Sequence, residues 1–313
     1  MKSRFAIAIV GSLFMAGQAA AEDRRIVVLG DMPYGKPAKV YPLYETLIDT
    51  IDARAPDLVI HVGDTKSGSS ECTDRHLAEQ LAYLDSFAAP TLYTPGDNEW
   101  TDCHRRKAGD LDVLDRLKRI RETYFNTPDT TFGRTKLTLS HQGDRGFPEN
   151  ARLMLDGVMV VTAHVVGSNN GFEARSREAV MEYFDRDAAN IAWIEEAFDA
   201  AQDRADALVL AIHADMFEPD FAETGRKWPR HSGFRTFGKK FRNRAEAFGK
   251  PVLLVFGDTH RHRVFAPFPK KAPDVTAVEV FGARDMHAVE ITIRRQTDGT
   301  IRFVIDPLLN PAL

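Results

Sequence analysis

The stretch at residues 92–100, LYTPGDNEW, ends a short apolar run with Gly96 and then places Asp97, Asn98 and Glu99 together. The pattern of an apolar run followed by Gly-Asp recurs as VVLGD, VIHVGD and LLVFGD, which end at Asp31, Asp64 and Asp258. Glycine allows a tight turn after a strand and aspartate is common in turns, so one such pair carries little information. Four pairs after apolar runs predict strands that deliver carboxylates to a common place.

The first three of these runs alternate with segments of helical periodicity. The predicted strands and the helices between them are, in chain order, 26–29, 41–53, 58–62, 76–87 and 91–94. This alternation is typical of a parallel sheet in an α/β protein. Because ligands bind at the carboxyl ends of such strands, we expect the aspartates in one crevice. Carboxylates gathered there repel each other unless a cation lies between them.

The rest of the chain continues the same pattern. The further predicted elements are a helix at 111–125, a hairpin at 152–156 and 158–163, an amphipathic helix at 190–202, strands at 207–212 and 251–256, and closing β segments at 277–281, 288–293 and 301–305. The strand at 207–212 ends at His213. No linker or low-complexity tract divides the chain, so we expect one domain over 22–313.

The N-terminus has the pattern of a secretory signal peptide. A short basic start, MKSR, precedes the apolar stretch FAIAIVGSLFMAG, and small residues at 19–21 provide a cleavage site. We expect a signal peptide over 1–21, cleavage after Ala21 and a periplasmic or secreted protein; an uncleaved anchor helix is the alternative. No second apolar run approaches about 18 residues, so no transmembrane segment is expected after cleavage.

Composition is that of an ordinary enzyme-sized chain, with 313 residues, 43% of them hydrophobic, and a formal net charge of −4. This balance does not favour nucleic acid as a partner. The two cysteines are Cys72 and Cys103. In an oxidising compartment an even count favours one disulfide, here between the loops that follow Asp64 and Asp97. Free buried thiols and a cysteine-ligated metal are the alternatives.

The ordered set of motifs resembles that of the calcineurin-like metallophosphoesterases. The family order is Asp-x-His, Gly-Asp, Gly-Asn-His-Asp/Glu, a lone His and Gly-His-x-His. Here the corresponding stretches are GDMPY, GDTKSG, PGDNEW, LAIH and GDTHRHR, at 30–34, 63–68, 95–100, 210–213 and 257–263. The resemblance spans about residues 26–263. It implies a four-layer α/β/β/α sandwich of two mixed sheets flanked by helices.

The resemblance also implies a site for two divalent metal ions. The implied ligands are Asp31, Asp64, Asp97, His213, Asp258 and His260, with Asp64 between the two ions. The implied function is that of a metal-dependent phosphoric-ester hydrolase, in which a metal-bound hydroxide attacks phosphorus in line. Its substrate would be a phosphorylated small molecule, and Asp64 and Asn98 are the expected catalytic residues.

Two positions depart from the family pattern. Pro33 stands where the family has a histidine ligand, and Asn98 stands where it has the histidine thought to assist the leaving group. Asparagine cannot deliver a proton at neutral pH. A shifted register, with Asn98 as ligand and Glu99 in the histidine's role, and a Tyr34 phenolate as ligand are alternatives. The second functional hypothesis is a catalytically weak homologue that binds metal or a phosphorylated ligand.

The last motif also has two registers, because GDTHRHR contains two histidines. Aligning Gly257 pairs Asp258 with His260, whereas aligning the histidines pairs His260 with His262. With four aspartates the site carries four negative charges and is rich in oxygen ligands. Such ligands favour Mn, Mg or Fe over Zn.

Basic side chains near these motifs are candidates for holding the substrate phosphate: Lys66, Arg105 and Arg261. As solvated loop charges they would need no function. A basic tract at 226–244, interleaved with aromatic residues, is consistent with binding to nucleic acid or lipid. However, its phenylalanines at 234, 237 and 241 have helical spacing, which favours a helix with a buried aromatic face and a charged outer face.

Overall fold

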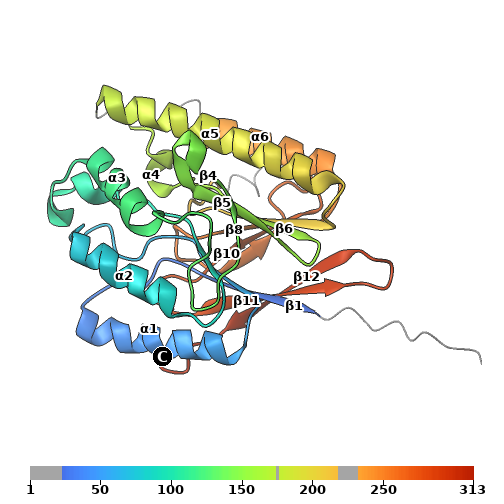
Figure 1. Ribbon diagram of the computed structural model, residues 1–313, viewed down its shortest axis with the longest axis horizontal. Helices are drawn as coiled ribbons and strands as arrows, with labels where there is room; N and C mark the ends of the chain where they lie inside the picture. Colours follow the sequence, from blue (N-terminus) through green and yellow to red (C-terminus); the bar gives the residue numbers. More distant parts are fainter. Residues whose placement is uncertain (1–22, 174–175, 218–231) are drawn as a thin grey trace, which may run out of the picture.

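A computed structural model describes residues 23–173, 176–217 and 232–313 of the chain. The predicted signal peptide at 1–21 and the first part of the basic tract, 226–231, lie outside these described residues. Two β-sheets form the middle of the molecule and helices lie on both outer sides (Figure 1). No helix in the described part of the chain is long and apolar enough to cross a membrane.

The first sheet joins the N-terminal strands to the last two strands. Its strands are β1 (Arg24–Leu29), β2 (Leu58–His61), β3 (Thr91–Tyr93), β11 (Ala288–Arg295) and β12 (Ile301–Leu308). Their order is β12-β11-β1-β2-β3, in which β1, β2 and β3 are parallel and β11 is antiparallel to β1. The carboxyl ends of the first three strands therefore lie at one edge.

The second sheet has seven strands. These are β4 (Ser140–Gln142), β5 (Phe147–Leu155), β6 (Val158–Thr162), β7 (Ala207–Ala211), β8 (Val252–Phe256), β9 (Arg263–Phe265) and β10 (Val275–Glu279). Their order is β4-β5-β6-β7-β8-β10-β9, with β6, β7, β8 and β10 parallel. The predicted hairpin is present as the antiparallel pair β5-β6.

Helices complete the outer layers. The first sheet is accompanied by α1 (Pro37–Ala53), α2 (Asp74–Ser86) and α3 (Val113–Tyr124), and the second by α5 (Arg177–Gln202) and α6 (Arg235–Phe248). Short turns of helix are η1 (Thr101–His104), η2 (Arg106–Ala108), η3 (Gly143–Arg145) and α4 (Gly167–Asn170). Leu47 and Ile51 of α1 pack with Val27 and Val59 of the first sheet.

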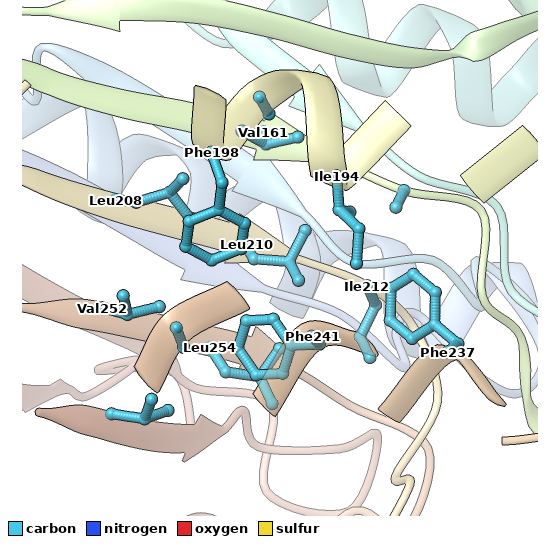
Figure 2. Packing of buried hydrophobic residues seen from close by; sticks show 14 of the residues in the cluster. Val161, Ile194, Phe198, Leu208, Leu210, Ile212, Phe237, Phe241, Val252 and Leu254 are labelled. Carbon is cyan, nitrogen blue, oxygen red and sulfur yellow. The ribbon is translucent and has the colours of Figure 1, made fainter. Parts of the chain in front are cut away.

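The alternation of side chains along the strands divides the core into layers. Ile26 and Ile60 of the first sheet meet Val160 and Val209 of the second, whereas Val27 faces α1 on the opposite side of its sheet. On the outer face of the second sheet, apolar side chains of α5 and α6 cover its strands (Figure 2); they include Ile194, Phe198, Phe237 and Phe241. The predicted four-layer sandwich is confirmed.

Helix α5 begins at Arg177, thirteen residues before the predicted start at 190. Its first half buries Arg186, which is 0% exposed and donates from Nη1 to the carbonyl of His164 at 3.0 Å. Asn190 donates to the same carbonyl at 2.7 Å. Because polar side chains occupy the buried face, the apolar periodicity that predicts a helix is missing there. The three-residue strands β4 and β9 were also missed, since so short a segment has no periodicity to detect.

The spacing of phenylalanines in the basic tract correctly predicts a helix. Phe237 and Phe241 are buried in α6, whereas Phe234 is partly buried just before the helix begins. The basic residues of α6 consequently lie on its outer side, as expected for an amphipathic helix.

Candidate metal centre

The predicted ligands meet at the edge where the parallel strands of both sheets end. Asp31, Asp64 and Asp97 follow β1, β2 and β3, while His213 follows β7 and Asp258 follows β8. Asp31 and Asp64 both have a φ of 55° and Asp258 a φ of 83°, in the left-handed region that few residues other than glycine adopt. Strained backbone of this kind is typical of functional sites.

Two groups of side chains offer ligand atoms to a cation. Asp31, Asp64 and His213 form one group, and Asp97, His213 and Asp258 form the other. Within each group the ligand atoms all lie within 4.8 Å of one another. The acids predicted to converge therefore do so, and His213 belongs to both groups.

The orientation of His213 is set by a backbone carbonyl. Its Nδ1 donates to the carbonyl oxygen of Val62 at 2.8 Å, which leaves Nε2 facing the carboxylates. Nε2 lies 3.0 Å from Asp97 Oδ1 and 3.5 Å from Asp64 Oδ1. A hydrogen bond that fixes one ring nitrogen and presents the other is the usual arrangement of a metal-binding histidine.

Three glycines make room for the carboxylates. A Cβ atom on Gly96 would lie 2.0 Å from Asp64 Oδ1, and one on Gly257 would lie 2.2 Å from Asp31 Oδ2. A Cβ atom on Gly167 would lie 2.5 Å from Asp97 Oδ1. Any side chain at these positions would push the carboxylates apart, so glycine is needed for their close approach.

The pKa values of the carboxyl groups show that bringing these acids together in a buried place is unfavourable. Burial raises the pKa of Asp31 to about 7, and burial also raises the pKa of Asp64 and Asp258 well above the usual range. Burial acts in the same direction on Asp97, but hydrogen bonding and charge from His213 leave the pKa of that carboxyl below its usual value. A divalent cation would replace these protons, so the residues fit a metal site.

Of the two histidines in the last motif, His260 faces the acids. Its Nε2 lies 3.5 Å from Asp31 Oδ1. The Nδ1 of His262 donates to the carbonyl of Glu279 at 2.8 Å, and its ring stacks on Phe281 with a centroid distance of 4.3 Å. In the part of the chain that the structure describes, His260 alone of the two lies beside an acid of the centre, which favours the register that pairs Asp258 with His260.

Asn98 lies beside the first group of ligands. Its Nδ2 donates to the hydroxyl of Tyr34 at 3.1 Å and to Asp64 Oδ2, and its backbone N–H donates to Asp64 Oδ1 at 2.9 Å. Tyr34 in turn donates to Asp64 Oδ2 at 3.0 Å. Burial and the charge of Asp64 raise the pKa of Tyr34 well above its usual value, which favours the phenol as a hydrogen-bond donor to Asp64.

Glu99 holds the loops that carry the ligands. Its carboxylate accepts hydrogen bonds from the N–H groups of Asp64 at 3.2 Å and Gly96 at 3.1 Å, and from Thr65 Oγ1 at 2.8 Å. It is 0% exposed. Since these donors occupy its oxygens, Glu99 does not take the histidine's role in the shifted register.

The predicted phosphate-binding residues differ in position. Lys66 is buried and donates to the carbonyl of Ser67 at 3.0 Å, and burial lowers its pKa. Arg105 pairs with Asp102 at 2.6 Å and lies next to Asn98, since a Cβ on Gly68 would meet Arg105 Nη1 at 2.5 Å and Asn98 Oδ1 at 2.6 Å. Pro33 lines a hollow together with Lys66.

Arg261 is exposed, and its backbone N–H donates to Glu279 at 3.2 Å. The next arginine, Arg263, was not predicted: its guanidinium bridges Asp215 and Glu279, and the Nε to Glu279 distance is 2.6 Å. The N–H of Asp215 donates to Asp258 Oδ2 at 3.2 Å. Arg263 thus stabilises the loop that carries Asp258, through Asp215 and Glu279.

Ser168 was also missed by the sequence analysis. Its hydroxyl lies 2.8 Å from Asp97 Oδ2 and 3.1 Å from Asp102 Oδ1, so it links a predicted ligand to a second buried acid. Ser168, Asn169 and Asn170 all have positive φ values, of 50°, 56° and 58°. The Asn-Asn pair was the one local signal for this turn, since asparagine tolerates the left-handed region.

The predicted disulfide between Cys72 and Cys103 is present, with a Cα–Cα distance of 5.8 Å. Cys103 Sγ lies 3.1 Å from the carbonyl oxygen of Glu99. The bridge joins the loops that follow Asp64 and Asp97 directly beneath Asn98 and Glu99.

A family model described as calcineurin-like phosphoesterase matches residues 24–262. The chain belongs to the calcineurin-like phosphoesterase family. Family membership makes it a metal-dependent phosphoric-ester hydrolase by class, and the Asp/His groups stand where such an enzyme needs divalent cations. A search of curated proteins found no match.

Solved structures show the same fold. A dimetal phosphatase from Danio rerio superposes with a TM-score of 0.55 and 10% identity, over 92% of this chain and 99% of that one. A purple acid phosphatase from yellow lupin (Lupinus luteus) seeds superposes with a TM-score of 0.50 and 13% identity, over 93% of this chain and 55% of that one. At these identities the likeness supports the fold of the calcineurin-like phosphoesterases alone.

Proposed function

We propose that this calcineurin-like phosphoesterase is a secreted hydrolase of phosphorylated small molecules with two divalent cations at its centre. Its ligands would be Asp31, Asp64, Asp97, His213, Asp258 and His260. The observation that carries the proposal is the pair of Asp/His groups whose ligand atoms lie within 4.8 Å of one another. The apolar N-terminal stretch and the disulfide support secretion.

When bound, divalent cations supply Lewis acidity toward the phosphoryl oxygens and lower the pKa of water. The chain's own residues set which cation binds. Four carboxylates against two histidines form a hard, oxygen-rich set that favours Mn, Mg or Fe over Zn. Asp64 belongs to the first ligand group, and its Oδ1 lies 3.5 Å from Nε2 of His213, which belongs to both groups.

Basic side chains at the edge of the acidic cluster would hold the substrate phosphate. Arg105 lies beside Asn98 with its side chain 48% exposed, so a ligand can reach it from solvent. Lys66 is buried and lies within electrostatic reach of Asp102, the partner of Arg105. Both amide hydrogens of Asn98 are directed at Asp64 and Tyr34, so Asn98 orients these groups rather than protonating a leaving group. Esters with acidic leaving groups would therefore react best.

Metal analysis combined with an ester assay tests this function. The purified protein should contain Mn, Mg or Fe and should hydrolyse 4-nitrophenyl phosphate or its bis-ester until a chelator is added. Asp64→Ala should abolish the reaction, whereas Asp306→Ala, at an exposed position of β12, should not. Stoichiometric zinc that persists in Asp97→Asn would contradict the proposed ligand set.

The hydrogen bonds of Asn98 to Tyr34 and Asp64 also favour a second candidate function, because they leave no group there to protonate a leaving group. A homologue with very slow turnover would still bind metal and a phosphorylated ligand through the same groups. Tight metal binding with no hydrolysis of any ester between pH 5 and 9 would identify this second function.

A further inference from the structure

A second cleft lies between helices α5 and α6, and none of the predicted metal ligands lines it. It has a volume of about 580 Å³ and is formed by the turn before α5 and the first halves of both helices. Figure 1 shows the two helices side by side on the outer face of the second sheet. A hollow of this size suits a small organic ligand.

One wall of the cleft is aromatic. The ring of Phe172 stacks on Tyr183 with a centroid distance of 4.5 Å and an interplanar angle of 28°. Phe184 contacts both rings edge-on, at 5.7 Å from Phe172 and 5.1 Å from Tyr183, yet it is 54% exposed. A large apolar ring left in solvent beside two others provides a surface on which a planar ligand can stack.

The opposite wall is basic and polar. Arg235, Lys239 and Asn243 follow one another at four-residue spacing on α6, so they form one exposed stripe of that helix. Lys240 pairs with Glu195 at 3.0 Å. In contrast, no carboxylate within the described residues pairs with Arg235 or Lys239. As far as the structure describes the chain, two cations without a carboxylate partner therefore lie beside the aromatic wall.

We propose that this cleft binds a nucleoside phosphate, either free or as one unit of a single strand. The base would stack on Phe172 and Phe184, and the phosphate would lie against Arg235 and Lys239. Asn243 offers its amide N–H groups to the base or sugar, while its Oδ1 accepts from Arg242 at 3.0 Å. An acidic peptide would leave the rings unused, and an apolar ligand would leave the cations unused. A nucleoside phosphate uses both walls.

The cleft is joined to the metal centre by a short piece of chain. Ser168 contacts Asp97, and Phe172, four residues later, lines the cleft. Asn169 Oδ1 between them accepts from the N–H of Gly233, just before α6, at 2.7 Å. Four residues span at most about 14 Å, so an extended ligand can reach both places. Binding in the cleft does not depend on hydrolysis, and it can be measured separately.

Calorimetric titration of the full chain with AMP and with a 12-nucleotide oligo(dA) tests the proposal. One series retains the bound metal and another contains EDTA to prevent turnover. Phe184→Ala should raise the Kd at least about fivefold, the lower end for losing one stacked base. Phe184→Leu should do the same, because leucine keeps the apolar volume without a flat ring. Arg235→Gln with Lys239→Gln should weaken binding and flatten its salt dependence.

Matched controls come from the same molecule. Met181→Ala removes a side chain of α5 that is 50% exposed and lies outside the cleft, and Lys118→Gln removes a distant cation. Binding of AMP supports a free nucleotide as ligand, and binding of the oligonucleotide alone supports a unit of a strand. The proposal fails if neither binds at millimolar concentration, if the controls weaken binding equally, or if pyrophosphate binds as tightly as AMP.

Discussion

Removing the cations should make the stability of the protein fall as the pH rises from about 4 to about 7. Asp31 is 0% exposed, and burial raises its pKa to about 7 in the folded chain. An aspartate in an unfolded chain has a pKa of about 3.9. The folded state therefore binds the proton more tightly, so stability is full below about pH 4 and is lost as Asp31 ionises.

The magnitude follows from the width of that interval. Three pH units at about 1.4 kcal/mol each give about 4 kcal/mol from Asp31 alone. Asp64 and Asp258 act in the same direction, because burial raises their pKa values as well. A typical domain is stabilised by roughly 5–15 kcal/mol, so this loss is a large share of the total.

Urea unfolding of the chelator-treated protein between pH 5 and pH 8 measures this effect. The free energy of unfolding should decrease with pH, and Mn²⁺ or Mg²⁺ added at pH 7.5 should restore it. In Asp31→Asn the decrease between pH 5 and pH 8 should be smaller by about 3 kcal/mol, since about two of the three pH units fall in that window. Asp306→Asn, at an exposed position of β12, should behave like the wild type. A metal-free protein whose stability is independent of pH would refute the reasoning, as would an unchanged slope in Asp31→Asn.

Three further outcomes are expected. Replacing Cys72 and Cys103 together with serine should lower the free energy of unfolding by about 4 kcal/mol, measured with urea, because the bridge joins residues separated by 31 positions. Glu99→Gln should weaken metal binding in a calorimetric titration, because an amide nitrogen cannot accept the N–H groups of the ligand loops. Asn98→His should raise the rate of hydrolysis of alkyl phosphates by about 100-fold, because imidazole can protonate a poor leaving group. The gain on aryl phosphates should be smaller, because their leaving groups need no proton.

Equal stability of the serine variant and the wild type would show that the disulfide does not constrain the unfolded chain. Unaltered metal affinity in Glu99→Gln would mean that the loops are held by other contacts. An equal gain on both ester classes in Asn98→His would place the new imidazole away from the leaving group.

The acids of the centre could be predicted because each follows its own strand directly. Parallel strands end at the same edge, so Asp31, Asp64 and Asp97 were expected together without knowledge of the second sheet. The layers were likewise predictable from the resemblance, and the apolar runs are continuous because both faces of each sheet are buried.

Residues held by long-range packing could not be predicted in this way. Ser168 reaches Asp97 only because the two sheets stack with those two loops adjacent, and no local pattern encodes that stacking. Glu99 is next to the motif, but its role depends on where the loops of Asp64 and Gly96 are placed around it. The ring of His262 stacks on Phe281, after β10, whereas His260 lies beside Asp31 after β1, and no local pattern encodes either contact.

Each group of predicted ligands takes side chains from both sheets, with Asp31 and Asp64 on one and His213 on the other. A bound cation would thus act as a cross-link between the two halves of the sandwich, whereas without it Nε2 of His213 meets Asp97 Oδ1 at 3.0 Å across the same edge. After chelation, amide hydrogens at the ends of β2 and β7 should exchange with solvent first, while the opposite rim stays protected. Loss of metal would then appear as a local separation of the two sheets at this edge rather than as global unfolding.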